Sequence, residues 1–477
     1  MHWNNHIQAI HPVAPPRVHT HSHMFHNLAC LCFASLLLSG LPHVYGQAWD
    51  LPMPDDSTYS ITAKELVSPR ATKKAPNPLA AFLAIPEITQ VISVPETPSR
   101  DYGDDARFVV TSQNSQILLQ AFDHLVNQTR PEDWYWAELG IGPANDWTTG
   151  SPAAVRKALQ AVNLCAISAM LSGDQDLALA TFTSLAKFSE IIQRQPCGLA
   201  HLVISTTALR MSQAQLERTL VLRHLGPHRL SELQQQLTIR ELGVSDIQRA
   251  LRIDYTQFSA SLPQLADADD LTEYQGTTRL DPFASLLLKP GITCTMRLEY
   301  DQVLLAALGR SWKEGLQIAA NTNREFIFAT RHLAQRRLNP NPLGEYHHQQ
   351  HLSKMPVLLD EFAQCITAHR LTLLQIAIRR YELDQDKLPA QLDELVPKYL
   401  PAVPTDPFAN APMRWNPNKQ ALYSVGLDFI DDGGKFWRPA APGESDMGML
   451  YWWGEPGGRR RHTASDTTVL CVPLPRK

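Results

Sequence analysis

The clearest hydrophobic periodicity lies in the last third of the chain, where residues 358–383 contain neither proline nor glycine. Leu359, Phe362 and Ile366 recur there at spacings of three and four, which places them on one face of an α-helix. At 1.5 Å per residue this helix would be roughly 40 Å long. Pro389 follows it and prevents a simple continuation.

Several short elements are predicted after this helix. We expect a short helix over residues 390–396, followed by an extended segment around Asp406 that prolines on both sides keep rigid. Two short strands, 413–415 and 421–424, are joined by turn-forming residues at 416–418. Residues 355–440 are therefore predicted to form a C-terminal α+β module.

Helical signals also dominate the middle of the chain. Residues that cap or stop helices divide the span 151–266 into consecutive helices joined by short connections. Helices connected in this way pack as antiparallel neighbours, so we predict a mainly α body built as a bundle or solenoid. The signals are Ser151–Pro152, Gly173–Asp174, Pro196, Gly226–Pro227, Ser245 and Pro263.

The rest of the body is predicted with less regular signals. Residues 298–332 again have a helical pattern, and we assign the whole helical domain to residues 106–340. Residues 338–356 are polar and contain Pro342 and Gly344, so we predict a polar connector between the body and the long helix.

The N-terminal region, residues 1–46, has the features of a leader. A start at Met24 gives an apolar core over residues 28–41, and small residues before Gln47 fit a signal-peptidase site. Because the apolar run is shorter than a membrane span of about 20 residues, we expect no stable span after cleavage and an anchor only if the leader stays.

Two further segments complete the predicted organisation. Residues 47–105 are rich in proline and are predicted to form a linker or an arm lying on the body. Residues 441–477 are predicted to form an irregular tail.

Charge and cysteine content reduce the number of functional classes that the sequence supports. The chain has 43 basic and 47 acidic residues, a net charge of −4, which gives no basic face for nucleic acid. None of the seven cysteines forms a C-x-x-C pair, so the best signals for zinc and thioredoxin-like sites are missing. Cys165 and Cys197 would lie far apart along a helical hairpin, and we expect no disulfide between them.

The sequence has no motif that identifies an enzyme. It contains no G-x-S-x-G, P-loop or dinucleotide-binding pattern, and we assign no catalytic residue. The best cluster of zinc-type ligands combines a carboxylate with imidazoles four residues apart, but its place in the polar connector favours a solvated surface. This cluster consists of Glu345, His347, His348 and His351.

The C-terminal module resembles a known family. The run Y-E-L-D-Q-D-K-L-P-A-Q-L-D-E-L-V-P-K-Y-L-P-A-V-P-T-D-P-F, followed by Y-S-V-G-L-D-F-I-D-D-G-G, is similar to the globular part of type II secretion major pseudopilins. It resembles still more the tails of large secreted bacterial proteins of the planctomycete and verrucomicrobial type. The resemblance implies a long helix packed on a small antiparallel sheet. The family's processing site has no counterpart before this helix.

The resemblance also implies a metal site. The calcium-binding loop of these pseudopilins corresponds in position to Asp428, Asp431 and Asp432, and glycines beside them permit a tight loop. An ordinary acidic turn is the alternative. We therefore expect calcium as the one candidate cofactor.

Together these features predict an extracytoplasmic, periplasmic-type protein without enzymatic activity. Its expected role is binding or scaffolding in the cell envelope, linked to a type II secretion or pilus-like system, with an envelope protein or surface component as its partner. The alternative is an envelope hydrolase whose active site cannot be recognised in one sequence.

Overall fold

The structure is a computed structural model. It describes residues 53, 55, 59, 78–93, 112–130, 134, 152–222, 225–267, 288–333, 341–418, 420–431, 433 and 472–473. The chain divides into two units, residues 1–50 and 51–477, and every described residue belongs to the second unit. The predicted leader, the start at Met24 and the cleavage site near Gln47 lie outside the described residues.

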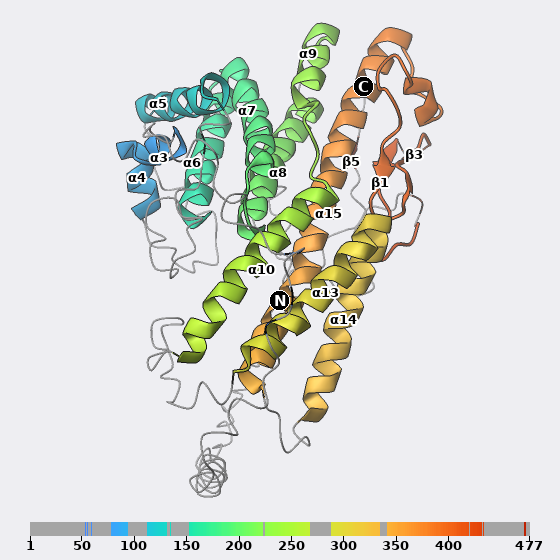
Figure 1. Cartoon of the computed structure of the whole chain (residues 1–477). Helices are drawn as coiled ribbons and strands as arrows, with labels where there is room; N and C mark the ends of the chain where they lie inside the picture. The colour runs from blue at the N-terminus through green and yellow to red at the C-terminus, as the bar shows by residue number, and fades with distance from the viewer. Residues whose placement is uncertain are drawn as a thin grey trace, which may run out of the picture. The chain divides into compact units, whose positions relative to one another are not determined.

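The body is an antiparallel array of α-helices, as predicted, and the second half of its last helix carries a small C-terminal module (Figure 1). The helices of the first part of the chain are α3 (Pro78–Leu83), α4 (Pro86–Ser93), α5 (Ser112–Asp123), the π-helical turn η3 (His124–Gln128), α6 (Pro152–Leu171), α7 (Gln175–Arg194) and α8 (Leu199–Leu222). Those of the second part are α9 (Pro227–Leu237), α10 (Val244–Asp267), α13 (Pro290–Arg310), α14 (Trp312–Leu333) and α15 (Pro342–Gln385).

Local capping signals located the central helices well. The predicted break at Gly173–Asp174 is confirmed, because α6 ends at Leu171 and the Asp174 side chain accepts a hydrogen bond from Leu177 N at the start of α7. Gly173 has φ +98, a conformation that glycine adopts without strain. The predicted stop at Gly226–Pro227 is also confirmed, with Gly226 as the N-cap of α9.

The fifth predicted helix differs at both ends. Ser245 was predicted to be its cap, but α10 already begins at Val244, and Asp246 in the first turn accepts a hydrogen bond from Gly243 N at 2.9 Å. The helix also continues through Pro263 to Asp267. Proline loses a single backbone hydrogen bond in a helix, and here it lies within the last turns, where that loss does not end the helix.

The helix predicted over residues 298–332 is in fact a helical hairpin. Ser311 has the extended conformation φ −166, ψ 155 and separates α13 from α14, which pack against each other. The Ser311 hydroxyl accepts a hydrogen bond from Glu314 N at 3.2 Å and so caps α14. Figure 1 shows α13 and α14 beside α15.

The long helix begins earlier than predicted. The prediction of a polar connector over residues 338–356 is wrong, because α15 starts at Pro342 and contains Pro356. Pro342 occupies the first turn, where its missing N–H costs nothing. The helix has 44 residues, and Asp386, with φ 54, ends it.

The C-terminal module contains two small antiparallel sheets after a 3-10 turn, η5 (Leu392–Leu395). The strand β1 (Thr405–Asp406) pairs with β2 (Ala411–Pro412). The predicted hairpin is confirmed as β3 (Arg414–Asn416) and β4 (Ala421–Tyr423), in register Trp415↔Leu422. A fifth strand that was not predicted, β5 (Val472–Pro473), pairs with β4.

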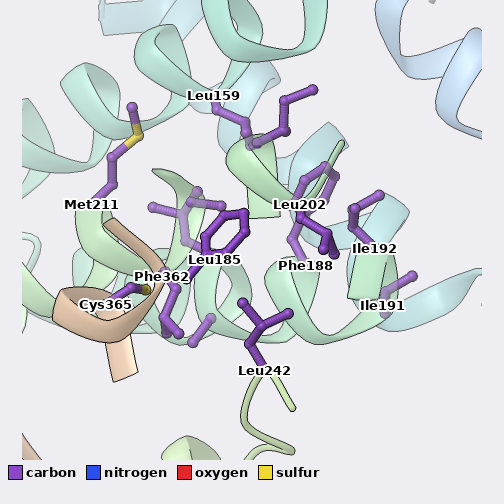
Figure 2. Packing of buried hydrophobic residues seen from close by; sticks show 14 of the residues in the cluster. Leu159, Leu185, Phe188, Ile191, Ile192, Leu202, Met211, Leu242, Phe362 and Cys365 are labelled. Carbon is purple, nitrogen blue, oxygen red and sulfur yellow. The ribbon is translucent and has the colours of Figure 1, made fainter. Parts of the chain in front are cut away.

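One hydrophobic core runs through the helices and reaches the module. Figure 2 shows Leu185 and Phe188 of α7, Leu202 of α8 and Phe362 of α15 among its members. Phe408 and Val425 of the module belong to this same cluster. The C-terminal half of α15 carries the module's own core, in which Leu374, Ile378, Leu395, Tyr399, Met413 and Leu422 are buried.

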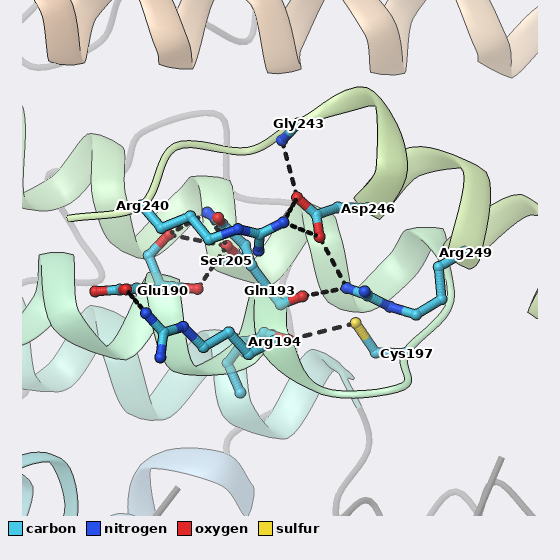
Figure 3. Close-up of polar contacts among 11 residues, drawn as sticks. Glu190, Gln193, Arg194, Cys197, Ser205, Arg240, Gly243, Asp246 and Arg249 are labelled. Carbon is cyan, nitrogen blue, oxygen red and sulfur yellow. Dashed lines mark hydrogen bonds and ion pairs between the residues drawn. The ribbon is translucent and has the colours of Figure 1, made fainter. Parts of the chain in front are cut away.

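An ion pair with a buried carboxylate fixes the start of α10 against the end of α7 (Figure 3). The Asp246 side chain has no exposed surface and accepts hydrogen bonds from Arg240 at 2.8 Å and Arg249 at 2.9 Å. Arg249 also donates to the carbonyl oxygen of Gln193 at the end of α7. This carboxylate therefore has a structural role.

None of the helices that the structure describes has both the length and the hydropathy to cross a membrane.

Candidate functional site

The predicted acidic loop follows β4 at the end of the module. Asp428 and Asp431 are both described, whereas Asp432 lies outside the described residues. Asp428 Oδ1 accepts a hydrogen bond from Ile430 N at 3.0 Å. Asp431 is bound more tightly, because its two oxygens accept from Gly433 N at 2.8 Å, Tyr423 OH at 3.1 Å and Arg414 Nε at 2.7 Å.

These contacts make Asp431 an ionised group. Partial burial alone would raise the pKa of its carboxyl group, but the hydrogen bonds from Gly433 and Tyr423 and the charge of Arg414 outweigh burial. The pKa is therefore lowered. Asp428 and Asp431 lie on one loop, but their carboxylates accept hydrogen bonds from different groups.

The same loop exposes the apolar side chain of Ile430 to solvent, next to a residue with a strained backbone. Phe429 has φ 61, a left-handed conformation that is strained for an aromatic residue. Its ring lies 6.5 Å from the ring of Phe408 and 5.3 Å from Lys313 Nζ of α14. The next residue, Ile430, is 59% exposed. We call residues 426–431 the Ile430 loop.

Asp406 supports the base of this loop, and the sequence analysis assigned it no role. Its side chain is fully buried and accepts hydrogen bonds from Phe408 N at 3.0 Å, Ser424 Oγ at 2.8 Å and Val425 N at 2.9 Å. Arg414 NH1 lies 3.6 Å from Asp406 and connects it to Asp431. The feature of the sequence that indicates this role is a carboxylate in a segment that prolines on both sides keep rigid.

Polar contacts fix the module to the body. Arg370 of α15 pairs with Glu241, which lies between α9 and α10, and its NH1 also donates to the carbonyl oxygen of Thr405 at 2.5 Å. Gln234 of α9 donates to the carbonyl oxygen of Tyr399 at 2.7 Å. The module and the Ile430 loop therefore have a defined position on the helical body.

Two histidines of the predicted polar connector, His348 and His351, are buried in a second polar cluster, and His347 beside them is half-buried. His351 Nε2 lies 2.8 Å from Asp301 Oδ1 of α13, and Tyr59 OH donates to Asp301 Oδ2 at 3.3 Å. We call this cluster the histidine junction; its members are Tyr59, Asp254 of α10, Arg297, Tyr300 and Asp301 of α13, and His347, His348 and His351 of α15. The helical spacing of His348, His351 and Met355 indicates this buried face in the sequence. A hydrophobic pattern does not detect it, because histidine is a polar residue.

The part of the chain described here includes two of the three carboxylates of the acidic loop, Asp428 and Asp431. Within the described part, no three or more histidine, cysteine, aspartate or glutamate side chains meet in a way that could hold a metal ion. Glu345, the fourth residue of the predicted cluster, is half-buried in the first turn of α15. Cys165, Cys197 and Cys365 are buried free thiols, and Cys294 is buried as well. Burial raises the pKa of Cys197 and of Cys365 to about 12.

Comparison of the chain with protein-family models, with curated proteins and with solved structures gives no match.

Proposed function

We propose that the chain is a non-enzymatic binding or scaffold protein of the cell envelope, which contacts an envelope protein or surface component through the Ile430 loop. The observation that carries this proposal is the exposure of Ile430, at 59%, on a loop that hydrogen bonds and a strained Phe429 hold in place. Backbone strain of this kind concentrates at functional sites. A partner that covers Ile430 removes apolar surface from water, which favours binding.

Two features support a place in the envelope. The first is the leader predicted in residues 1–46. The second is the burial of the four described cysteines, because buried cysteines react slowly and tolerate an oxidising compartment. The sequence of a long helix and then a small antiparallel sheet supports the likeness to pseudopilins, and we place the module in a secretion or pilus-like system.

We also propose that Asp428, Asp431 and Asp432 bind calcium. Asp431 is ionised, and its present charge partner, Arg414, retains Asp406 as a second partner if a cation takes its place. The cation would then tie the Ile430 loop to the end of β4 through Tyr423.

Thermal melting of the full chain tests calcium binding. Calcium at a hundredfold excess over its dissociation constant should stabilise the fold by about 2.7 kcal/mol relative to chelator. Asp431→Asn should lose this response, whereas Asp393→Asn, an exposed carboxylate on η5, should keep it. Equal melting temperatures with calcium and with chelator would refute the metal site and leave the binding role standing.

Capture from envelope extracts of the native host tests the binding role. The full chain should retain a partner saturably, and Ile430→Ser should weaken retention by about tenfold or more, since burial of such a side chain contributes about 1.5–3 kcal/mol. Val303→Ser is the matched control, because Val303 is 55% exposed on the regular helix α13. Equal loss in both variants would contradict the assignment of the loop. Turnover of an extract component by the wild-type chain would favour the envelope hydrolase instead.

A further inference from the structure

The histidine junction brings ionisable groups of three helices together out of solvent. The Asp301 side chain has no exposed surface, and Arg297 Nε lies 3.8 Å from its Oδ2. His348 and His351 place their rings edge-on against Tyr300, at centroid distances of 6.2 and 5.6 Å. These contacts join the first turns of α15 to α13.

Two neighbouring groups extend the junction to α10 and to Tyr59. The ring of His347 lies 6.4 Å from that of Phe258 on α10, and the guanidinium of Arg297 stacks over the same Phe258 ring at 4.9 Å. Arg252 Nε donates to the carbonyl oxygen of Tyr59 at 2.6 Å. These contacts come from separate segments, so the junction joins α10, α13, α15 and Tyr59.

We propose that the histidine junction is an acid-sensitive switch, which holds residues 342–355 of α15 against α13 and α10 at neutral pH and releases them on acidification.

The uncharged state of the buried histidines favours closure at neutral pH. There Asp301 lies beside the guanidinium of Arg297, and the imidazoles add no competing positive charge. Burial, together with the charges of His351 and Arg297, lowers the pKa of His348 to about 4, although Asp301 opposes this shift. Burial, followed by Arg297, also lowers the pKa of His351, although Asp301 opposes this shift.

Acidification reverses the charge of the junction. Burial raises the pKa of Asp254 to about 6 against the opposing effects of Arg297 and the hydrogen bond from Leu199 N, so this carboxylate is neutralised first. Protons then add to the imidazoles, and their positive charges lie close to the guanidinium of Arg297. Lys354 and Arg252 add further positive charge around the pair of His351 and Asp301, and Tyr59 and Tyr300 stay protonated because their pKa values are raised.

The sign of the linkage follows from these directions. A histidine whose pKa is lower in the closed form than its free value of about 6.5 binds protons more readily in the released form. The closed form therefore loses stability as the pH falls below about 6.5. Asp254 acts in the opposite sense between its raised and its free pKa, but one carboxyl group opposes three imidazoles.

Amide hydrogen exchange of the full chain, followed by mass spectrometry at pH 7.5 and 5.0 and corrected for intrinsic rates, tests the switch. Residues 342–355 should exchange roughly tenfold faster at pH 5.0. The reference helix α7 should keep its protection, because it lies outside the junction. Equal corrected rates at the two pH values, or parallel loss of protection in α7, would overturn the proposal.

Variants separate titration from loss of packing. His348→Leu and His351→Gln remove an imidazole each, and the glutamine keeps an N–H for Asp301; each should reduce the acid response while residues 342–355 stay protected at pH 7.5. His228→Leu is the control, since its side chain is 89% exposed on α9, and it should respond to acid as the wild type does. An acid response that survives in the double variant His348→Leu/His351→Gln would also overturn the proposal.

Discussion

At the residue scale, the buried carboxylate of Asp406 joins separate segments of the module. Its carboxylate satisfies two backbone N–H groups and a hydroxyl group that would otherwise be buried without an acceptor. Leaving such donors unsatisfied costs about 1–3 kcal/mol each. The side chain thus joins β1 to the segment that leads into the Ile430 loop.

We expect Asp406→Asn to destabilise the module by about 3 kcal/mol, because an amide cannot accept all three hydrogen bonds and leaves Arg414 with less compensation. Local opening free energies from amide exchange of residues 404–426 measure this effect. Asp393→Asn, on the exposed side of η5, is the control and should change them by less than about 0.5 kcal/mol. A similar small change in both variants would show that Asp406 is dispensable.

Sequence alone located Asp406 but not its function. The prolines around it predicted a rigid extended segment, and β1 lies there. Its hydrogen-bond partners, Ser424 and Val425, are nearly twenty residues away, and only the return of β4 brings them to the carboxylate. The same holds for His351 and Asp301, whose contact joins separate helices. Long-range partners of this kind leave no periodic signal.

At the element scale, the hairpin of α13 and α14 depends on one small residue. A Cβ on Gly315 of α14 would lie 2.3 Å from Leu308 Cδ2 and 3.4 Å from its Cα on α13. Leu308 is itself buried, so it has little room to move. Glycine at this position lets the two helices approach closely.

Two glycine substitutions should therefore have opposite effects. Gly315→Ala should destabilise the chain by about 1–3 kcal/mol through overpacking. Gly309→Ala, on the exposed end of α13 with no atom within 4 Å, should stabilise it by about 0.5 kcal/mol, because alanine loses less backbone entropy. Urea unfolding of both variants measures the pair, and destabilisation by both alike would rule out the close contact.

Helix boundaries were predictable where they are set locally. Asp174 caps α7 with its own side chain, and Gly226 and Pro227 start α9, so a few neighbouring residues were enough. The start of α15 was missed because its first turns contain polar residues whose burial comes from α10 and α13. The break at Ser311 was missed because a single extended residue leaves the surrounding helical pattern unchanged.

At the scale of the whole molecule, the module and the body share a hydrophobic core and are joined by an ion pair. Phe408 and Val425 extend the body's core, while Arg370 pairs with Glu241 at side-chain exposures of 21% and 29%. Partial burial makes this pair stronger than a surface ion pair. The two parts are therefore expected to unfold together.

A double-mutant cycle measures this coupling. Arg370→Gln and Glu241→Gln should show an interaction energy of about 1–2 kcal/mol in urea unfolding, and the double variant should begin to separate the transition of the module from that of the body. The control cycle uses Arg229 and Asp176, an exposed pair between α9 and α7, with an expected energy under about 0.5 kcal/mol. Equal energies in the two cycles would exclude a special role for Arg370.

The length of α15 has a mechanical consequence. Its 44 residues span about 66 Å at 1.5 Å per residue, with the histidine junction near one end and the core of the module on the other half. The first turns of α15 pack on α13, and its last turns carry the module that the contacts of Arg370 and Gln234 fix to the body. A change in packing at the junction would accordingly be transmitted along one continuous helix to the segment that positions the Ile430 loop.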